Sequence, residues 1–265
     1  MIKGLQAGFG DPIGAPLLTE LRARGVQMVR LDMQPVTSPA AFAALIDEAL
    51  VAGLRPLLII RPDQAAWMPV GPALDVEVLN EPDLAGWGAA DYAATITDVW
   101  RVLGGRHRLW AGGVSNCTSK TLVWLLQVLQ RLPVDIGASV HRYPKNGATP
   151  SAPQEGFKTR TAEMDYLLRV VGGRPWGVSE VGYHTAEQRT GWWFWTRRWH
   201  WTDTQVAAFV ASELTWWKHA GAAFCVVYQI NDDLGDTNPA DRFGIRRRDG
   251  SWKPVADVFR EECVR

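Results

Sequence analysis

The feature that most limits the fold of this chain is a regular alternation of short apolar runs with amphipathic segments. Some runs, such as residues 56–60 and 223–227, are continuously hydrophobic, as strands buried on both faces are. This alternation is typical of parallel strands joined by crossover helices. We expect eight strands, at residues 4–8, 26–31, 55–60, 76–79, 108–111, 136–140, 177–181 and 223–228.

The segments between these runs carry signals that begin and end helices. Ser38 and Pro39 are a favourable N-cap and first helical residue, and Gly25 and Gly53 stand where helices should end. The alternation predicts the α/β class and a single (β/α)8 TIM barrel with short loops over residues 1–265, with a doubly wound open sheet as the alternative. We expect helices at residues 15–24, 40–52, 89–103, 118–132, 158–171, 203–220 and 254–262.

Composition excludes several classes of protein. The 28 Lys and Arg residues balance 28 Asp and Glu residues, which argues against nucleic-acid binding because that needs clustered excess positive charge. No apolar stretch reaches the roughly 18 residues that a membrane span needs. The three cysteines, Cys117, Cys225 and Cys263, are scattered and suit neither a disulfide framework nor a zinc site. The N-terminus has no apolar signal core, so we expect a cytoplasmic protein or the mature form of a secreted one.

Polar side chains gather at the expected C-terminal ends of the strands, where barrel enzymes carry their active sites. Asn80 and Glu81 follow the fourth strand, and Glu180 lies in the seventh. Two glutamates facing each other across a barrel mouth are the minimum set for glycoside hydrolysis, with one as acid/base and the other as nucleophile or base. Candidate substrate-binding or supporting residues at the other strand ends are Arg30, His141, Tyr143, Tyr228 and Gln229.

These residues resemble the motifs of glycoside hydrolase clan A, a group of TIM-barrel retaining glycosidases. Asn80-Glu81-Pro82 is similar to the clan's Asn-Glu-Pro at strand four, and residues 178–182 resemble its strand-seven segment. Arg30 matches the strand-two arginine, and His141-Arg142-Tyr143 is similar to the His-x-Tyr of the cellulase-like family 5. The chain departs from family 5 after strand three, and its Tyr228-Gln229, in place of the usual strand-eight tryptophan, looks closer to family 39.

The resemblance implies a mechanism and a substrate class. Glu81 would donate the proton to the leaving oxygen, and Glu180, kept ionised by Arg30 and Tyr143, would attack the anomeric carbon. Asn80 would hydrogen-bond the sugar 2-hydroxyl. The carboxyl groups should then lie about 5 to 5.5 Å apart, with retention of configuration, and no metal or organic cofactor is needed. The expected substrate is a β-linked poly- or oligosaccharide, cleaved internally because short loops leave the barrel mouth open.

Other interpretations of the same residues remain open. Glu81 could be a carboxylate at a helix N-terminus, and Glu180 could belong to a structural ion pair. A catalytically inactive carbohydrate-binding TIM barrel is the main alternative function. An unrelated barrel enzyme, such as a lyase or aldolase, would need a lysine or a metal cluster at a strand end, and none of the expected strands ends in lysine.

Tryptophan is the unusual residue of the composition, with 14 in the chain and five between positions 192 and 201. Large flat rings suit carbohydrate stacking, and this segment follows the strand that carries Glu180. We therefore expect Trp192, Trp193 and Trp195 to form sugar subsites. Packing of the loop onto the barrel, or contact with a protein partner or a membrane surface, are the alternatives for the same cluster.

Overall fold

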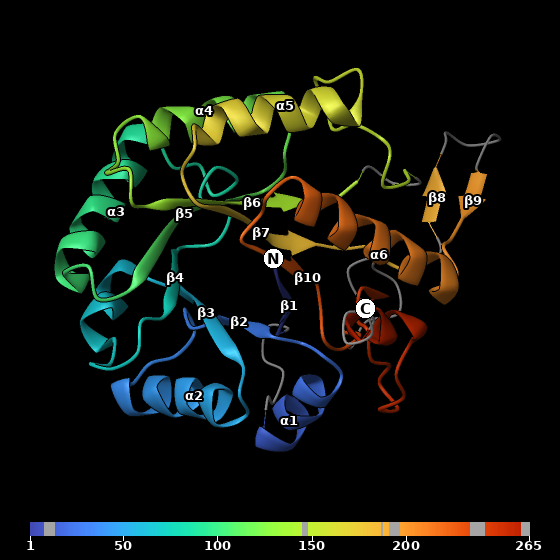
Figure 1. Cartoon of the computed structure of the whole chain (residues 1–265), viewed down its shortest axis with the longest axis horizontal. Coiled ribbons are helices and arrows are strands. Elements are labelled where there is room, and N and C mark those ends of the chain that lie inside the picture. The colour runs from blue at the N-terminus through green and yellow to red at the C-terminus, as the bar shows by residue number, and fades with distance from the viewer. Residues whose placement is uncertain (8–13, 145–147, 187, 191–196, 234–241, 261–265) are drawn as a thin grey trace.

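The computed structural model is a closed barrel of parallel strands with helices around it (Figure 1). It describes residues 1–7, 14–144, 148–186, 188–190, 197–233 and 242–260. Around the barrel the strands follow the order β1-β10-β7-β6-β5-β4-β3-β2, and the parallel pairing of β1 with both β10 and β2 closes the sheet. The predicted (β/α)8 TIM barrel is confirmed, and the open sheet is excluded.

All eight predicted strands are present in the barrel. The barrel strands are β1 (Ile2–Gln6), β2 (Met28–Asp32), β3 (Arg55–Ile60), β4 (Asp75–Val78), β5 (Arg108–Val114), β6 (Gly137–Arg142), β7 (Trp176–Val181) and β10 (Phe224–Val227). The helices that follow them are α1 (Ala15–Ala23), α2 (Pro39–Val51), α3 (Ala89–Leu103), α4 (Ser119–Leu129), α5 (Arg160–Val171) and α6 (Asp203–His219), with 3₁₀ segments η1 (Pro62–Trp67) and η3 (Pro254–Phe259).

Local sequence sets the ends of several helices. The Ser38 hydroxyl accepts a hydrogen bond from the Ala41 amide at the start of α2, and the Thr202 hydroxyl does the same for Gln205 at the start of α6. Such side-chain caps satisfy amides that have no partner within the helix. At its C-terminus α3 ends on Gly104 with φ of 60°, a left-handed conformation that glycine adopts without penalty.

The N-terminal half of the barrel interior is filled by side chains. Trp110 and Phe224 meet edge to face with ring centroids 4.9 Å apart. A Cβ at Gly137 would lie 2.4 Å from the Trp110 ring, and one at Gly177 would lie 2.5 Å from the Phe224 ring, so these glycines make room for the aromatic plug. Because the plug closes this half of the barrel, the polar interior lies toward the C-terminal ends of the strands.

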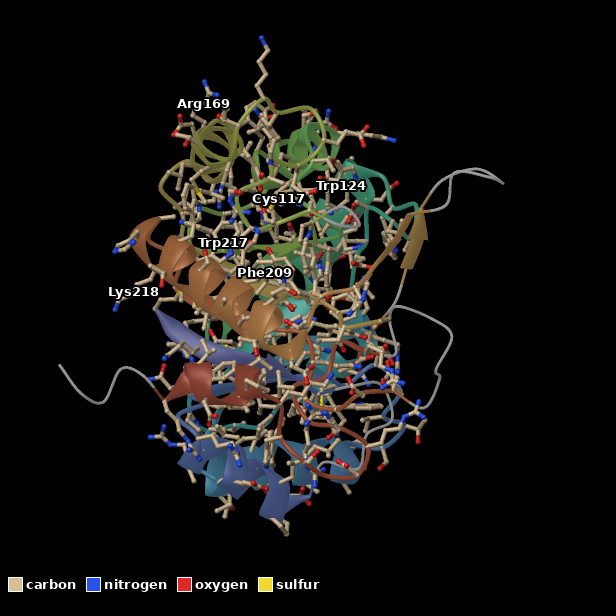
Figure 2. The ribbon with its side chains drawn as sticks, turned by 90° about the vertical axis from the view of Figure 1, so that its right-hand side faces the viewer. Cys117, Trp124, Arg169, Phe209, Trp217 and Lys218 are labelled. Carbon is tan, nitrogen blue, oxygen red and sulfur yellow. The ribbon has the colours of Figure 1, made fainter. Side chains whose placement is uncertain are left out.

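Helix α6 covers β7 and carries aromatic side chains toward the barrel. Trp217 is fully buried, and its ring lies edge to face on Trp176 with centroids 5.9 Å apart. Phe209 lies about two turns toward the N-terminus of the same helix, as Figure 2 shows. Its ring packs against Tyr183 and Trp201. These contacts bind the helix to the strand that carries Glu180.

The structure corrects three details of the predicted elements. β5 continues to Val114 instead of ending at residue 111, because a bulge between Gly112 and Val114 lets the strand keep pairing with β6. The predicted C-terminal helix is the 3₁₀ segment η3, whose hydrogen bonds span three residues, as from the Ala256 amide to the Lys253 carbonyl. The predicted loop after β7 contains the antiparallel hairpin of β8 (Gln188–Thr190) and β9 (Arg197–Trp199), which stands outside the ring of helices in Figure 1.

Two further sequence expectations concern cysteine and membrane segments. Cys117 and Cys225 are free and buried, and Cys263 lies outside the described residues. Among the helices that the structure describes, none combines the length and the apolarity required to cross a bilayer.

Candidate active site

Glu81 is held at the end of β4 by an unusual backbone. Leu79 and Glu81 have φ of 63° and 46°, a left-handed conformation that costs energy for residues with a Cβ and is found at functional sites. The Leu79 amide donates to the Ile60 carbonyl of β3, and the Glu81 amide donates to the Gly113 carbonyl of β5. The next α-helix, α3, begins only at Ala89, so Glu81 is not a carboxylate at the N-terminus of an α-helix.

The glycine bulge of β5 provides space for the polar groups of neighbouring strands. Gly112 and Gly113 have φ of 117° and 59°. A Cβ at Gly113 would lie 3.4 Å from His141 Nε2 and 3.7 Å from Arg30 Nη2. Glycine at this position therefore allows the strand to take a left-handed turn and lets the imidazole and the guanidinium approach the β5 backbone.

Arg30, on β2, is completely buried and joins four strands of the barrel. Its Nη1 donates to Glu180 Oε1 at 2.5 Å and to Gln6 Oε1 at 2.7 Å. Its Nη2 donates to Asn80 Oδ1 at 2.9 Å, and its Nε donates to Glu77 Oε2 at 2.6 Å. The guanidinium therefore positions the nucleophile candidate, Glu180, and the side chain that precedes the acid/base candidate.

Glu180 is almost completely buried, with 8% of its side chain exposed. A register shift between β6 and β7 places His141 directly opposite Glu180. The Tyr143 hydroxyl, from the end of β6, donates to Glu180 Oε2 at 2.5 Å. Each carboxylate oxygen of Glu180 thus accepts a hydrogen bond, one from Arg30 and one from Tyr143, and the group is fixed in a single orientation.

The environment favours the ionised form of Glu180. Burial alone raises the pKa of a carboxyl group, but the nearby His141 and Arg30 and the hydrogen bonds from Tyr143 and Arg30 outweigh it and hold the pKa of Glu180 below its usual value. Burial and the Glu180 charge raise the pKa of the Tyr143 hydroxyl well above its usual value. Tyr143 therefore keeps its proton and remains a donor.

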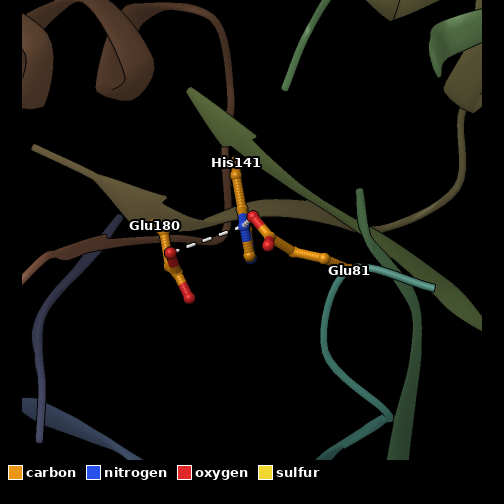
Figure 3. A group of neighbouring side chains, drawn as sticks. All are labelled: Glu81, His141 and Glu180. Carbon is orange, nitrogen blue, oxygen red and sulfur yellow. Dashed lines mark hydrogen bonds and ion pairs between the residues drawn. The ribbon is translucent and has the colours of Figure 1, made fainter. Parts of the chain in front are cut away.

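His141 lies between the two candidate catalytic carboxyl groups (Figure 3). Its Nδ1 is 3.0 Å from Glu81 Oε1 and 3.5 Å from Glu180 Oε2. One oxygen of Glu81 and one of Glu180 lie within 4.8 Å of each other. Glu81 is the more accessible of the two, with 27% of its side chain exposed against 8% for Glu180.

The same three side chains are of the types that bind metal ions. Glu81, His141 and Glu180 each offer one ligand atom, all within 4.8 Å of one another. However, the Arg30 guanidinium lies 2.5 Å from Glu180 Oε1 and 3.5 Å from His141 Nε2, and its positive charge repels a cation at this place. The arrangement suits a pair of carboxyl groups acting on a substrate better than it suits a metal centre.

Solved structures of glycoside hydrolases have the same fold. A family 39 glycoside hydrolase from the gut symbiont Bacteroides cellulosilyticus WH2 is similar with a TM-score of 0.71 and 16% identity over 97% of this chain. This chain spans 62% of the length of that protein. The family 17 β-1,3-glucanosyltransferase of Rhizomucor miehei has a TM-score of 0.67 and 15% identity, with 97% of both chains covered.

A third similar structure is Thermotoga maritima Cel5A in complex with mannotriose substrate, with a TM-score of 0.63 and 13% identity over 97% of both chains. This chain has the barrel fold of these enzymes. No protein-family model matches the sequence, and no curated protein is similar to it in sequence. The predicted resemblance to clan A barrels is therefore confirmed at the level of structure.

The remaining predicted residues of the described chain also line this end of the barrel. Tyr228 lies edge to face on Tyr143, with ring centroids 6.1 Å apart. Phe243 lies 5.6 Å from each of these two rings and completes an aromatic cluster beside Glu180. Gln229 is buried, and neither atom of its side-chain amide has a hydrogen-bond partner among the described residues. Trp192, Trp193 and Trp195 lie outside the described residues.

Sequence reasoning missed three residues of the site. Glu77 and Gln6 both accept hydrogen bonds from Arg30, and Phe243 packs on the predicted tyrosines. Gln6 and Glu77 belong to strands β1 and β4 and not to the segments that follow strands, where most of the predicted residues were expected. A charged residue inside a strand buried on both faces needs a partner, and this signal identifies Glu77 as a member of a polar cluster.

Proposed function

We propose that this protein is a retaining β-glycoside hydrolase in which Glu180 is the nucleophile and Glu81 is the acid/base, with residues 1–265 forming one catalytic domain. The observation that carries the proposal is the convergence of two carboxyl groups within 4.8 Å in different environments. Glu180 is buried and held ionised by Arg30 and Tyr143, while Glu81 is more accessible. The short separation suits direct attack on the sugar and leaves no room for the water that an inverting enzyme places between its carboxyl groups.

The first step forms a bond between a Glu180 oxygen and the anomeric carbon. The bond from that carbon to the glycosidic oxygen breaks, and Glu81 transfers its proton to the departing oxygen. The product is a glycosyl ester of Glu180, and the leaving sugar departs as an alcohol. Arg30 and Tyr143 hold Glu180 in line for the attack.

The second step reverses these roles. Glu81, now a carboxylate, accepts a proton from water, whose oxygen bonds to the anomeric carbon while the ester bond to Glu180 breaks. Two inversions give net retention. The Oδ1 of Asn80 is occupied by Arg30 Nη2, which leaves the amide nitrogen of Asn80 to donate to the sugar 2-hydroxyl. Tyr228, Gln229 and His141 support the same site.

The substrate class we propose is a β-linked poly- or oligosaccharide, cleaved internally. One structurally similar enzyme is named as a β-1,3-glucanosyltransferase, and another was solved with mannotriose. The aromatic rings of Tyr143, Tyr228 and Phe243 provide an apolar surface beside Glu180 on which a neutral sugar ring can stack.

We expect the protein to release reducing ends from at least one of β-glucan, mannan, xylan, galactan or a bacterial exopolysaccharide. The first product, followed by ¹H NMR before mutarotation, should be the β-anomer, because double displacement retains configuration. Internal cleavage should lower the viscosity of the polymer before many reducing ends appear. An α-anomer as first product would contradict the retaining mechanism, and binding without any cleavage would favour the inactive carbohydrate-binding barrel.

Replacing Tyr143 with phenylalanine should move the acidic limb of the pH profile of kcat/KM to higher pH. The Tyr143 hydroxyl helps to hold the pKa of Glu180 below its usual value. Activity requires ionised Glu180 and is lost as the pH falls through that pKa, so a higher pKa moves the loss to higher pH. Tyr166→Phe on the outer helix α5 is the control, and an unchanged limb in Tyr143→Phe would contradict the assigned contact.

A further inference from the structure

One buried guanidinium serves two carboxylates in the interior of this barrel. Arg30 Nε donates to Glu77 Oε2 at 2.6 Å, and Arg30 Nη1 donates to Glu180 Oε1 at 2.5 Å. The side chains of Arg30, Glu77 and Glu180 are 0%, 1% and 8% exposed. In such a setting charges interact strongly because little water screens them, so each carboxylate affects how strongly Arg30 stabilises the other.

Glu77 takes no direct part in the proposed reaction. It lies inside β4, four residues before Glu81, and is completely buried. Its Oε1 has no hydrogen-bond partner in the described part of the chain, so its interaction with Arg30 is the main contact that its carboxylate makes. A buried charge is costly unless it is paired, and the pair formed with Arg30 is therefore a fixed part of the site.

The charge of this cluster changes during the proposed reaction. Before attack, Arg30 faces the negative charges of both Glu77 and Glu180. When Glu180 becomes an ester, its charge disappears and Arg30 keeps Glu77 as its counterion. If Glu77 were neutral, the whole Arg30 charge would stabilise ionised Glu180, and forming the ester would leave Arg30 buried without a counterion.

We propose that Glu77 is a positioning residue. By pairing with Arg30 it weakens the stabilisation that Arg30 gives to ionised Glu180, and so balances formation of the glycosyl ester against its hydrolysis. The consequence for catalysis rests on the proposed function, whereas the effect on the charge of Glu180 does not. With Glu77 ionised, Glu180 stays basic enough to attack the anomeric carbon. The same charge limits how strongly Arg30 stabilises the Glu180 carboxylate that is released when the ester is hydrolysed.

Other ionisable groups also face these carboxylates and must stay unchanged in a test. Burial, and to a smaller extent the charge of Glu77, raise the pKa of the Tyr92 hydroxyl on α3. The groups that face Glu180 come from four parts of the barrel: Arg30 and Asp32 on β2, Glu81 after β4, His141 and Tyr143 on or after β6, and Tyr228 after β10.

Two substitutions, each of which exchanges glutamate and glutamine and so nearly preserves the side-chain shape, change the charge around Arg30 in opposite directions. Glu77→Gln keeps an oxygen that accepts from Arg30 Nε and removes one negative charge. Gln6→Glu keeps the acceptor for Arg30 Nη1, which lies 2.7 Å from Gln6 Oε1, and adds one negative charge. The pKa of Glu180 is measured by ¹³C NMR of the full chain labelled at glutamate carboxyl groups, with the signal assigned by its loss in Glu180→Gln.

We expect the pKa of Glu180 to fall by about one unit in Glu77→Gln and to rise by about one unit in Gln6→Glu. The acidic limb of kcat/KM should move in the same two directions. In Glu77→Gln, formation of the glycosyl ester from a dinitrophenyl glycoside should slow about tenfold, while hydrolysis of the ester should be no slower.

Unchanged Glu180 titration in a folded variant, or shifts of the same sign in both, would overturn the proposal. The NMR measurement needs no turnover, so it separates two kinds of failure. Opposite shifts in a protein that hydrolyses no glycoside would reject the proposed function and retain the charge relation. Hydrolysis without these shifts would reject only the role of Glu77.

Discussion

Hydrolysis of an aryl β-glycoside should fall at least about 10⁴-fold when Glu180 is replaced by alanine, the order of loss seen when an enzyme's nucleophile is removed. The substitution removes the carboxylate that accepts from Arg30 at one oxygen and from Tyr143 at the other, and no other side chain among the described residues accepts from both. Binding of the sugar should be largely retained. Undiminished turnover in this variant would reject Glu180 as the nucleophile.

Azide distinguishes the role of Glu180 from that of Glu81. In Glu180→Ala, azide can occupy the space of the lost carboxylate and attack a substrate with a good leaving group, giving an α-glycosyl azide. In Glu81→Ala the glycosyl ester still forms from such a substrate, and azide then gives the β-glycosyl azide. ¹H NMR of the products identifies the anomer, and the opposite pairing of variants and anomers would exchange the two assignments.

A matched control for Glu180→Ala is a variant that loses a carboxylate outside the proposed active site. Asp47 is exposed on α2, on the outer side of the barrel. Asp47→Ala should leave the turnover of the same aryl glycoside within about twofold, since surface substitutions away from the site change stability by only about 0.5 kcal/mol.

Replacing Arg142 with methionine should destabilise the protein by about 3–5 kcal/mol. Arg142, on β6, is fully buried, and its Nε and Nη1 donate to Glu163 at 2.9 Å and to Glu213 at 2.8 Å. Its Nη2 also donates to the carbonyl of Ala152 at 2.6 Å, in the segment after β6. Methionine fills part of the volume but leaves two buried carboxylates without this partner.

The remaining partners of these carboxylates can offset only part of the loss. Arg160 still donates to Glu213 at 2.9 Å, and the Tyr183 hydroxyl donates to the same carboxylate at 2.9 Å. One guanidinium would then serve two buried carboxyl groups, from α5 and α6. The loss should therefore weaken the attachment of both helices to the barrel.

Urea denaturation monitored by tryptophan fluorescence measures this effect. Arg101→Met on α3 is the matched control, because the Arg101–Asp98 ion pair is exposed, with 68% and 73% of the two side chains accessible. Exposed pairs contribute at most about 1 kcal/mol. Equal losses in the two variants would show that the buried cluster of Arg142, Glu163 and Glu213 does not stabilise the fold.

The fold was predictable because its signals are local. The hydrophobic runs of the eight strands, the Ser38 cap and the glycines at helix ends all act within a few residues, and the structure confirms them. The hairpin β8–β9 was not predictable in the same way. Its strands are three residues long and lie in a segment of clustered tryptophan and arginine, in which neither the helical nor the strand period stands out.

The site was predictable in part. Asn80, Glu81, His141, Tyr143 and Glu180 stand at strand ends, and the barrel topology brings these ends together. Glu77 escaped prediction because its importance comes from a contact with Arg30, 47 residues away in the chain, and not from a motif. Phe243 escaped because it reaches the site from the segment after β10, whose path the sequence does not indicate.

Hydrophobic period, caps and turn residues act locally, so the alternating strands and helices, the barrel and the two glutamates at strands four and seven could be predicted from the sequence. The way in which Arg30 pairs with Glu77 and Glu180 arises only in the folded chain. Gln6 and Glu180 lie 24 and 150 residues from Arg30, and closure of the barrel buries both side chains against its guanidinium. Burial removes the water that would screen these charges, so their mutual effect depends on distances that exist only in the folded chain.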